Sequence, residues 1–162
     1  MNEILSIILK DTYSLTSLKH RLRILQSYFL KTFFGEIETS VNMPLSPQDS
    51  NWLKSLPSSF YQKFNKDNIY NIFSGLEKIG TNTPILTMHL AFELNDTTLS
   101  QIGAFTRKTF DSPSLLLDIK VDPNLIAGTA LSWKGVYRDY SLRAKLEQKR
   151  QELLEEFRKF LR

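Results

Sequence analysis

The sequence predicts an α+β fold, in which an N-terminal helical bundle over residues 1–80 precedes a small α/β domain over residues 84–162. In the first part, apolar residues recur every three or four positions, which is the spacing of one helix face. From residue 84 onward, apolar and polar residues alternate, which is the spacing of a half-buried strand. Hydrophobic residues make up 41% of the chain and charged residues 23%. This is ordinary globular usage, and the length suffices for a sizeable core.

The longest predicted helix of the first part begins at Ser14 and ends at Gly35. Serine is a favoured N-cap and glycine a favoured terminator. The apolar stripe of this helix advances by three or four residues, so its members share one face. They are Leu15, Leu18, Leu22, Leu25, Phe29 and Phe33. The preceding "MNEILSIILK" is predicted as a short helix with a buried face, because its apolar run is far below the roughly 20 residues that span a bilayer.

Two further helices are predicted before the chain changes character. Ser46 caps the first of them, and Asp49 follows three residues after the cap, as in a capping box. The second begins near residue 67 and ends at Gly80, which is a typical terminator. Residues 36–45 show neither period and are predicted to be irregular.

The α/β part is predicted to run in the order strand, helix, strand, strand, strand, helix. The first strand lies in "PILTMHLAFEL" at residues 84–94, and Asp96 caps the helix that follows. The second strand is "LLLDIKV" at residues 115–121. The third and fourth strands, "LIAGTALSW" at residues 125–133 and "VYRDY" at residues 136–140, form a hairpin.

The predicted hairpin turns at Lys134 and Gly135, where glycine permits the positive φ of a tight turn. Asp139 and Ser141 then form a strand-to-helix corner, which side-chain-to-backbone hydrogen bonds hold. Ser141 caps a long helix that runs to the C-terminus. Two main interpretations of this helix stay open: it packs on the chain's own sheet, or it offers its apolar face to a partner helix. A membrane-surface helix is a weaker third option, because anionic lipid would repel its glutamates, Glu147, Glu152, Glu155 and Glu156.

The sequence predicts no catalytic, cofactor-binding or metal-ligating residues, and therefore no enzyme. It contains no cysteine, which removes thiolate ligands and cysteine nucleophiles together. His20 and His89 each stand apart from other ligand types, whereas a zinc or iron site needs several ligands close together. No glycine-rich phosphate-binding loop is present.

The charge pattern is mildly basic, with a formal net charge of +4 from 21 basic and 17 acidic residues. Mixed charges are typical of a solvated surface, because nucleic-acid binders usually gather their basic residues in one stripe. A small basic nucleic-acid-binding adaptor is nevertheless an alternative function. In that case, Lys and Arg within residues 19–31 would contact phosphates and nearby aromatic rings would stack on bases.

One combination of residues stands out in the α/β part. A hydrophobic strand precedes an acidic residue, a leucine, a small residue with glycine, a hairpin, and an Asp-x-Ser corner. These residues are Leu115, Leu117, Val121, Asp122, Leu125, Ala127, Gly128, Leu131, Asp139, Ser141 and Leu142. With the helix "LRAKLEQKRQELL" that follows, the combination resembles the C-terminal region of the delta subunit of F-type ATP synthases, the oligomycin-sensitivity-conferring subunit of mitochondria. The resemblance covers about residues 84–154, and the helical part before it is shorter than is usual in that family.

The resemblance implies a non-catalytic stator subunit that needs no cofactor. Such a subunit links the alpha/beta catalytic head to the b-subunit stalk, so that the head resists rotor torque during proton-driven ATP synthesis. The implied partners are the N-terminal helix of the alpha subunit and the C-terminal helix of the b subunit, with no nucleic acid and no direct membrane span. The implied location is the cell membrane, peripheral on its cytoplasmic side, within the ATP synthase complex.

The resemblance also suggests roles for particular residues. Those expected to shape the α/β domain are Asp122, Leu125, Ala127, Gly128, Asp139 and Ser141. Among them, Gly128 would permit a close approach of two backbone segments. The residues expected near the alpha-subunit helix are Leu18, Leu22, Leu25 and Phe29. The residues expected at the stalk contact are Phe157, Phe160 and Leu161.

Overall fold

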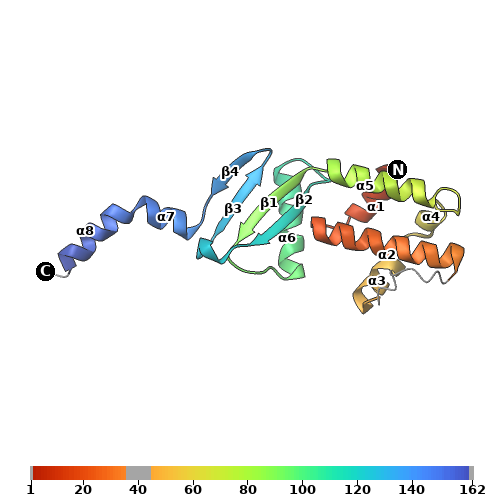
Figure 1. Ribbon diagram of the computed structural model, residues 1–162, viewed down its shortest axis with the longest axis horizontal. Helices are drawn as coiled ribbons and strands as arrows, with labels where there is room; N and C mark the ends of the chain where they lie inside the picture. The colour runs from red at the N-terminus through yellow and green to blue at the C-terminus, as the bar shows by residue number, and fades with distance from the viewer. Residues whose placement is uncertain (1, 36–44, 161–162) are drawn as a thin grey trace.

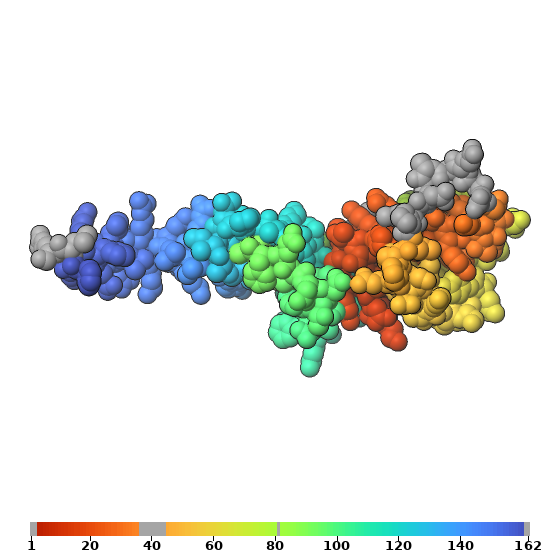
Figure 2. Space-filling view, turned by 90° about the horizontal axis from the view of Figure 1, so that it is seen from below, coloured from red at the N-terminus to blue at the C-terminus, as the bar shows by residue number. Residues whose placement is uncertain are grey.

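The computed structural model describes residues 2–35 and 45–160, and it has an elongated shape. A bundle of helices lies at one end, a four-stranded sheet with one covering helix lies in the middle, and two helices extend away at the other end (Figure 1). Helices therefore precede a mixed α/β region, which confirms the predicted α+β fold class. The space-filling view shows the last two helices as a narrow arm (Figure 2).

Within the described residues, five helices form the bundle. They are α1 (Asn2–Leu9), α2 (Leu15–Phe34), α3 (Pro47–Ser55), α4 (Ser58–Tyr61) and α5 (Ile69–Asn82). The predicted ends of α2 are confirmed, because the Ser14 hydroxyl accepts a hydrogen bond from the Ser17 amide and Gly35 has a φ of 78°. The predicted cap of α3 is confirmed as well, since the Ser46 hydroxyl accepts from the Asp49 amide. The predicted irregular segment 36–45 lies, apart from its last residue, outside the described residues.

The predicted stop at Gly80 is wrong, because α5 continues to Asn82. Its C-cap is Thr83, whose backbone is extended with a φ of −69° and a ψ of 139°. Thr83 precedes Pro84, and the proline ring disfavours the helical conformation for the residue before it. The proline therefore ends this helix, and Gly80 lies within it.

The bundle core is dense in aromatic rings. The ring of Phe29 from α2 stacks on that of Phe64, with 4.1 Å between the centroids. Phe64 in turn contacts Phe60 and Phe73. Leu116 from the sheet is also buried in this cluster, so the bundle core reaches the first residue of a strand.

The sheet of the described chain has four strands in the order β2-β1-β3-β4. Strand β1 (Ile85–Leu90) pairs in parallel with β2 (Leu116–Val121) and antiparallel with β3 (Thr129–Trp133), and β3 pairs antiparallel with β4 (Val136–Asp139). Helix α6 (Asp96–Thr109) connects β1 to β2. Its apolar residues Leu99 and Ile102 pack on the sheet face that carries Leu86, Met88 and Leu117. The predicted order of strands and helices in this region is thus present.

Several predicted boundaries in the sheet region are wrong. Strand β1 ends at Leu90 rather than continuing to residue 94, and Phe92 beyond it is exposed. The cap of α6 is Asn95, whose side chain accepts a hydrogen bond from the Thr98 amide, and not Asp96. Asn and Asp are equally good caps, so the sequence pattern did not separate the two neighbours.

The hairpin turn is confirmed, and both of its residues have positive φ. Lys134 has a φ of 47° and Gly135 a φ of 80°. Two consecutive positive values define the type I′ turn, which matches the twist of a two-residue hairpin. The third strand is shorter than predicted: β3 begins at Thr129, and residues 125–128 lie outside it. Leu125 instead ends a 3₁₀ turn, η1 (Pro123–Leu125).

The C-terminal segment forms two helices, α7 (Leu142–Gln148) and α8 (Arg150–Phe160), in place of the single long helix that the sequence predicts. Ser141 caps α7 as predicted. The break falls at Lys149, whose φ of −97° and ψ of 10° depart from helical values. Neither helix contains a buried residue, and both extend away from the sheet (Figure 1). The interpretation in which the last helix packs on the chain's own sheet is therefore wrong.

Candidate partner-binding surfaces

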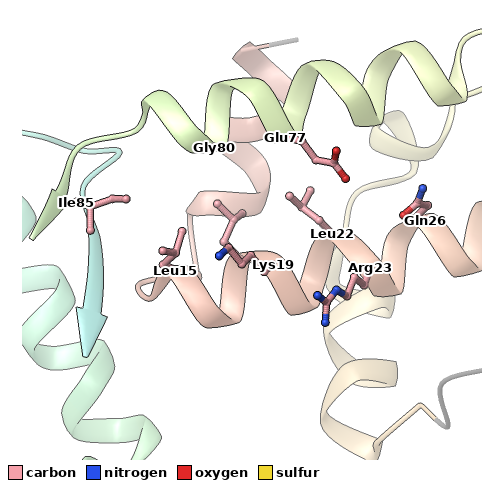
Figure 3. A pocket seen from close by; sticks show the side chains of 9 residues that line it. Leu15, Lys19, Leu22, Arg23, Gln26, Glu77, Gly80 and Ile85 are labelled. Carbon is pink, nitrogen blue, oxygen red and sulfur yellow. The ribbon is translucent and has the colours of Figure 1, made fainter. Parts of the chain in front are cut away.

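A groove of about 460 Å³ lies between α2 and α5. Its lining residues are Leu15, Leu18, Lys19, Leu22, Arg23, Gln26, Glu77, Gly80 and Ile85. Figure 3 shows the side chains of Leu15 and Leu22 pointing from α2 towards α5, and that of Glu77 pointing from α5 towards α2. The groove thus combines an apolar floor with charged groups.

The groove follows from the residues that face it. On α2, Leu15, Leu18 and Leu22 are spaced by three and four positions and lie on one helix face. On α5, Gly80 has no side chain, and a Cβ built there would lie 3.8 Å from Leu18 Cδ2, an ordinary contact distance. A larger side chain at Gly80 would fill the space, so this glycine keeps the groove open.

The rim of the groove carries charges of both signs. Lys19 and Arg23 are exposed on α2, one turn apart, and the exposed Glu77 faces them from α5. An apolar floor with charged edges is the surface that an amphipathic helix occupies when it lies in a groove. The geometry therefore suits a helix whose apolar residues are spaced by three and four positions.

The four residues expected at this surface divide into two pairs. Leu18 and Leu22 line the groove. Leu25 and Phe29 are not among its lining residues. All four belong to the bundle core: Leu18 is 1% and Leu22 8% exposed, and Leu25 and Phe29 are 0% and 2% exposed. Leu25 and Phe29 therefore lie behind the groove, and the partner contact expected of the four residues stays a prediction. The sequence stripe marks the whole buried side of α2 and does not distinguish groove floor from core.

A polar cluster holds α3 against α2, beside the bundle core. His20 Nε2 lies 3.1 Å from Asp49 Oδ1, and the Ser46 hydroxyl donates to Asp49 Oδ2 at 2.7 Å. Burial acts to raise the pKa of the Asp49 carboxyl, but the hydrogen bonds with Ser46 and His20 outweigh it, so this pKa is lowered. The Arg21 guanidinium lies 4.7 Å from the centre of the Trp52 ring, which adds a cation–π contact between the same helices.

At the other end of the sheet, the six motif residues converge on the first turn of α7. Asp122 caps η1 by accepting from the Asn124 amide, and Leu125 is buried. The Ala127 carbonyl accepts a 2.8 Å hydrogen bond from the Leu142 amide. The loop before β3 and the start of α7 are thus bonded directly to each other.

Gly128 and the Asp139–Ser141 pair complete this corner. Gly128 has a φ of 83°, and a Cβ there would lie 2.7 Å from the Tyr140 carbonyl oxygen. Asp139 Oδ1 accepts a 2.8 Å hydrogen bond from the Ser141 amide, while the Ser141 hydroxyl accepts from the Ala144 amide. The hydrogen bonds from Ser141 lower the pKa of the Asp139 carboxyl. These bonds confirm the predicted corner.

An apolar face runs along α7 and α8 beyond the corner. A shallow groove of about 360 Å³ on this face is lined by Ile126, Arg143, Leu146, Glu147, Arg150, Leu153, Leu154 and Phe157. Phe157 is 64% exposed and Phe160 is 88% exposed. Leu161, the third residue expected at the stalk contact, lies outside the described residues. This much exposed apolar surface on one arm is typical of a protein interaction site.

Within residues 2–35 and 45–160, no group of three or more His, Cys, Asp or Glu side chains is arranged to hold a metal ion. In the same part of the chain, every helix is too short or too polar to cross a membrane.

An elongated α+β molecule with an apolar groove at one end and an apolar arm at the other has the features of a protein that binds other proteins. Residues 62–153 match the family model described as ATP synthase delta (OSCP) subunit, and this range spans more than half of the chain. The chain therefore belongs to the ATP synthase delta (OSCP) subunit family. No curated protein matches the chain closely enough to count as a relative.

Family membership gives the general function. The protein is a non-catalytic component of the peripheral stalk of an ATP synthase, and it lies in that complex, peripheral to the membrane. The matched range includes α5, the sheet, the corner and the first part of α8. It excludes α2, so only the α5 and β1 sides of the groove lie within it.

Proposed function

We propose that this protein links the alpha/beta catalytic head of the synthase to the b-subunit stalk, so that the head resists rotor torque during proton-driven ATP synthesis. In this proposal, residues 1–80 form the domain that holds the head and residues 84–162 the domain that holds the stalk. The complex lies at the cytoplasmic side of the cell membrane. The groove between α2 and α5 carries the proposal, because its floor and rim suit a helix.

The proposed occupant of the groove is the N-terminal helix of the alpha subunit. Leu15, Leu18 and Leu22 provide the apolar floor, while Lys19 and Arg23 face acidic groups on that helix. A bound helix would cover the exposed part of Leu15, the most exposed of these leucines, and bring its charged edge to the rim. Leu25 and Phe29 support the floor from inside the bundle.

The proposed occupant of the α7–α8 face is the C-terminal helix of the b subunit. Phe157 and Phe160 are exposed aromatic anchors, a residue class that dominates interface energetics when it becomes buried. Arg143, Glu147 and Arg150 flank the apolar residues. They would set the register of the incoming helix through charge pairing.

The first experiment measures binding of a fluorescent peptide with the N-terminal sequence of the alpha subunit. Gly80→Phe fills the groove and should abolish binding, whereas Gly80→Ala leaves room for a helix and should retain most of it. Reversing both rim charges with Lys19→Glu and Arg23→Glu should weaken binding, while Lys54→Glu, an exposed lysine on α3, should not. Equal affinity of the wild type and Gly80→Phe would rule out this groove.

The second experiment measures binding of a peptide that carries the C-terminal sequence of the b subunit. Phe157→Ala and Phe160→Ala should each weaken binding, by about 2 kcal/mol if the residue is an interface hot spot. Phe105→Ala is the matched control, because Phe105 is also exposed but lies on α6, outside this face. If Phe105→Ala reduced affinity as much as Phe157→Ala, the stalk contact would not lie on the C-terminal arm.

A further inference from the structure

Besides the burial of Leu116 in the bundle core, the backbone of the described residues connects the bundle to the sheet in two ways. The chain passes once from α5 to β1 through Thr83 and Pro84. Separately, the loop between α1 and α2, residues 10–14, lies against the sheet. Ser14 forms a parallel bridge with Leu117, and the Leu117 amide donates to the Tyr13 carbonyl at 2.8 Å. The loop thus extends the sheet beyond the edge strand β2.

Arg107 of α6 fixes this loop from the sheet side. Its guanidinium donates to the carbonyls of Leu9 and Thr12, at 2.8 and 2.6 Å. The same side chain donates through Nε to the Leu115 carbonyl at 3.0 Å. One side chain therefore ties the end of α1, the loop and the start of β2 to α6. The planar fork of arginine suits several simultaneous bonds better than a lysine ammonium does.

Tyr13 packs into the same junction. Its ring lies under the Arg107 guanidinium, with 4.7 Å from Cζ to the ring centre. On α6, one turn before Arg107, a Cβ at Gly103 would come within 2.5 Å of Tyr13 Cβ. That distance is shorter than real contacts allow, so only glycine lets the loop lie this close to the helix.

The bundle fixes the loop from the other side. The Arg21 guanidinium of α2 donates to the Asp11 carbonyl at 2.8 Å and to the Thr12 hydroxyl at 2.6 Å. Thr12 is fully buried. Because Arg21 belongs to the bundle and Arg107 to the sheet region, the two arginines hold one loop between them.

We propose that Arg107, Tyr13 and Gly103 form a rigid joint that fixes the helical bundle at one angle to the sheet. A single linker such as residues 83–84 permits rotation about itself, and a second attachment removes that freedom. Arg107 is a positioning residue in this proposal, since it lines neither the α2–α5 groove nor the α7–α8 face. Its relevance to torque rests on the proposed function, whereas the rigidity itself does not.

The test is a distance measurement between spin labels on the full chain. The absence of natural cysteine allows labels at Ser74→Cys on α5 and Gln101→Cys on α6, both exposed positions. We expect a narrow distance distribution in the wild-type background. Arg107→Lys and Gly103→Ala should each broaden it, while Lys108→Ala, an exposed neighbour on the same helix, should leave it unchanged.

Several outcomes decide the proposal. A broad distribution in the wild type, or an unchanged one in folded Arg107→Lys, would overturn it. Circular dichroism checks that each variant is folded. If neither variant folds, hydrogen exchange of the Leu117 amide in the wild type decides instead: protection equal to that of the β1–β2 amides supports the joint, and rapid exchange overturns it.

The same variants separate this proposal from the proposed function. Folded Arg107→Lys should bind both the alpha-subunit peptide and the b-subunit peptide with wild-type affinity, because Arg107 lines neither surface. If wild-type protein binds neither peptide, the proposed function fails while the distance measurement still tests the joint. If the wild-type protein binds both peptides but shows a broad distance distribution, the proposal of a rigid joint is refuted and the proposed function stands.

Discussion

The Gly128 α-carbon and the Tyr140 carbonyl oxygen lie so close together that a Cβ on Gly128 would stand 2.7 Å from the oxygen. This approach brings the loop before β3 against the end of β4. It also allows the neighbouring Ala127 carbonyl to accept from the Leu142 amide. The direction in which the C-terminal arm leaves the sheet therefore depends on the absence of a side chain at Gly128.

Gly128→Ala should destabilise the protein and disturb the arm. Gly128 has a φ of 83°, and the left-handed region costs a non-glycine residue about 1–2 kcal/mol. The clash with Tyr140 adds to that cost. Gly135→Ala is the matched control, because Gly135 has a φ of 80° but no atom of the described residues within 4 Å of the added Cβ. Urea denaturation should show a larger loss for Gly128→Ala, and equal losses would contradict the close approach.

Acid should weaken the contact between α2 and α3. The pKa of the Asp49 carboxyl is lowered in the folded chain. Its contribution to stability is therefore present above the unfolded value, about 4, and is lost as the pH falls through the folded pKa. Asp49→Asn should flatten this part of the pH dependence of the free energy of unfolding. Denaturation series from neutral to strongly acidic pH measure it, and identical slopes in both proteins would refute the role of Asp49.

Phe29→Ala should be among the most damaging substitutions in the bundle. Phe29 is 2% exposed and stacks on Phe64, and removing such a side chain costs about 3–5 kcal/mol. Phe105→Ala should change stability by less than about 0.5 kcal/mol, since Phe105 is 69% exposed. Thermal unfolding followed by circular dichroism compares the two. A small effect at Phe29 would show that α2 is rotated relative to its described position.

Gly80→Ala should stabilise the protein. Gly80 lies within α5, where alanine is better than glycine by about 0.5–1 kcal/mol. The nearest described atom to its added Cβ is Leu18 Cδ2, at 3.8 Å. Thermal unfolding should show a higher midpoint for the variant. A lower midpoint would mean that the groove wall is closer to α2 than the structure shows.

Sequence reasoning succeeded where the deciding contacts are local. The caps at Ser14, Ser46 and Ser141 were predictable because each serine bonds an amide three residues later. The Lys134–Gly135 turn was predictable for the same reason, since a two-residue hairpin is specified by its own residues. The alternating pattern after residue 84 likewise indicated a sheet.

Features that depend on distant residues were not predictable. Two of the three partner carbonyls of Arg107 lie 95 and 98 positions earlier in the chain, and no periodicity marks such a pairing. Leu25 and Phe29 share a stripe with Leu18 and Leu22, and all four belong to the bundle core. Only the placement of α5 shows that Leu18 and Leu22 also line the groove. The predicted end at Gly80 is wrong for a different reason, because the effect of Pro84 on the backbone before it outweighs the glycine signal.

The break at Lys149 divides the C-terminal arm into two helices, and within the described residues only the first of them is hydrogen-bonded to the sheet region. Helix α7 is bonded to the sheet at the Asp139–Ser141 corner, whereas α8 follows it without a buried residue. A pull on α8 therefore reaches the body of the protein chiefly through the short α7 and its few corner bonds. Those bonds would bear such a pull before the larger hydrophobic cores do.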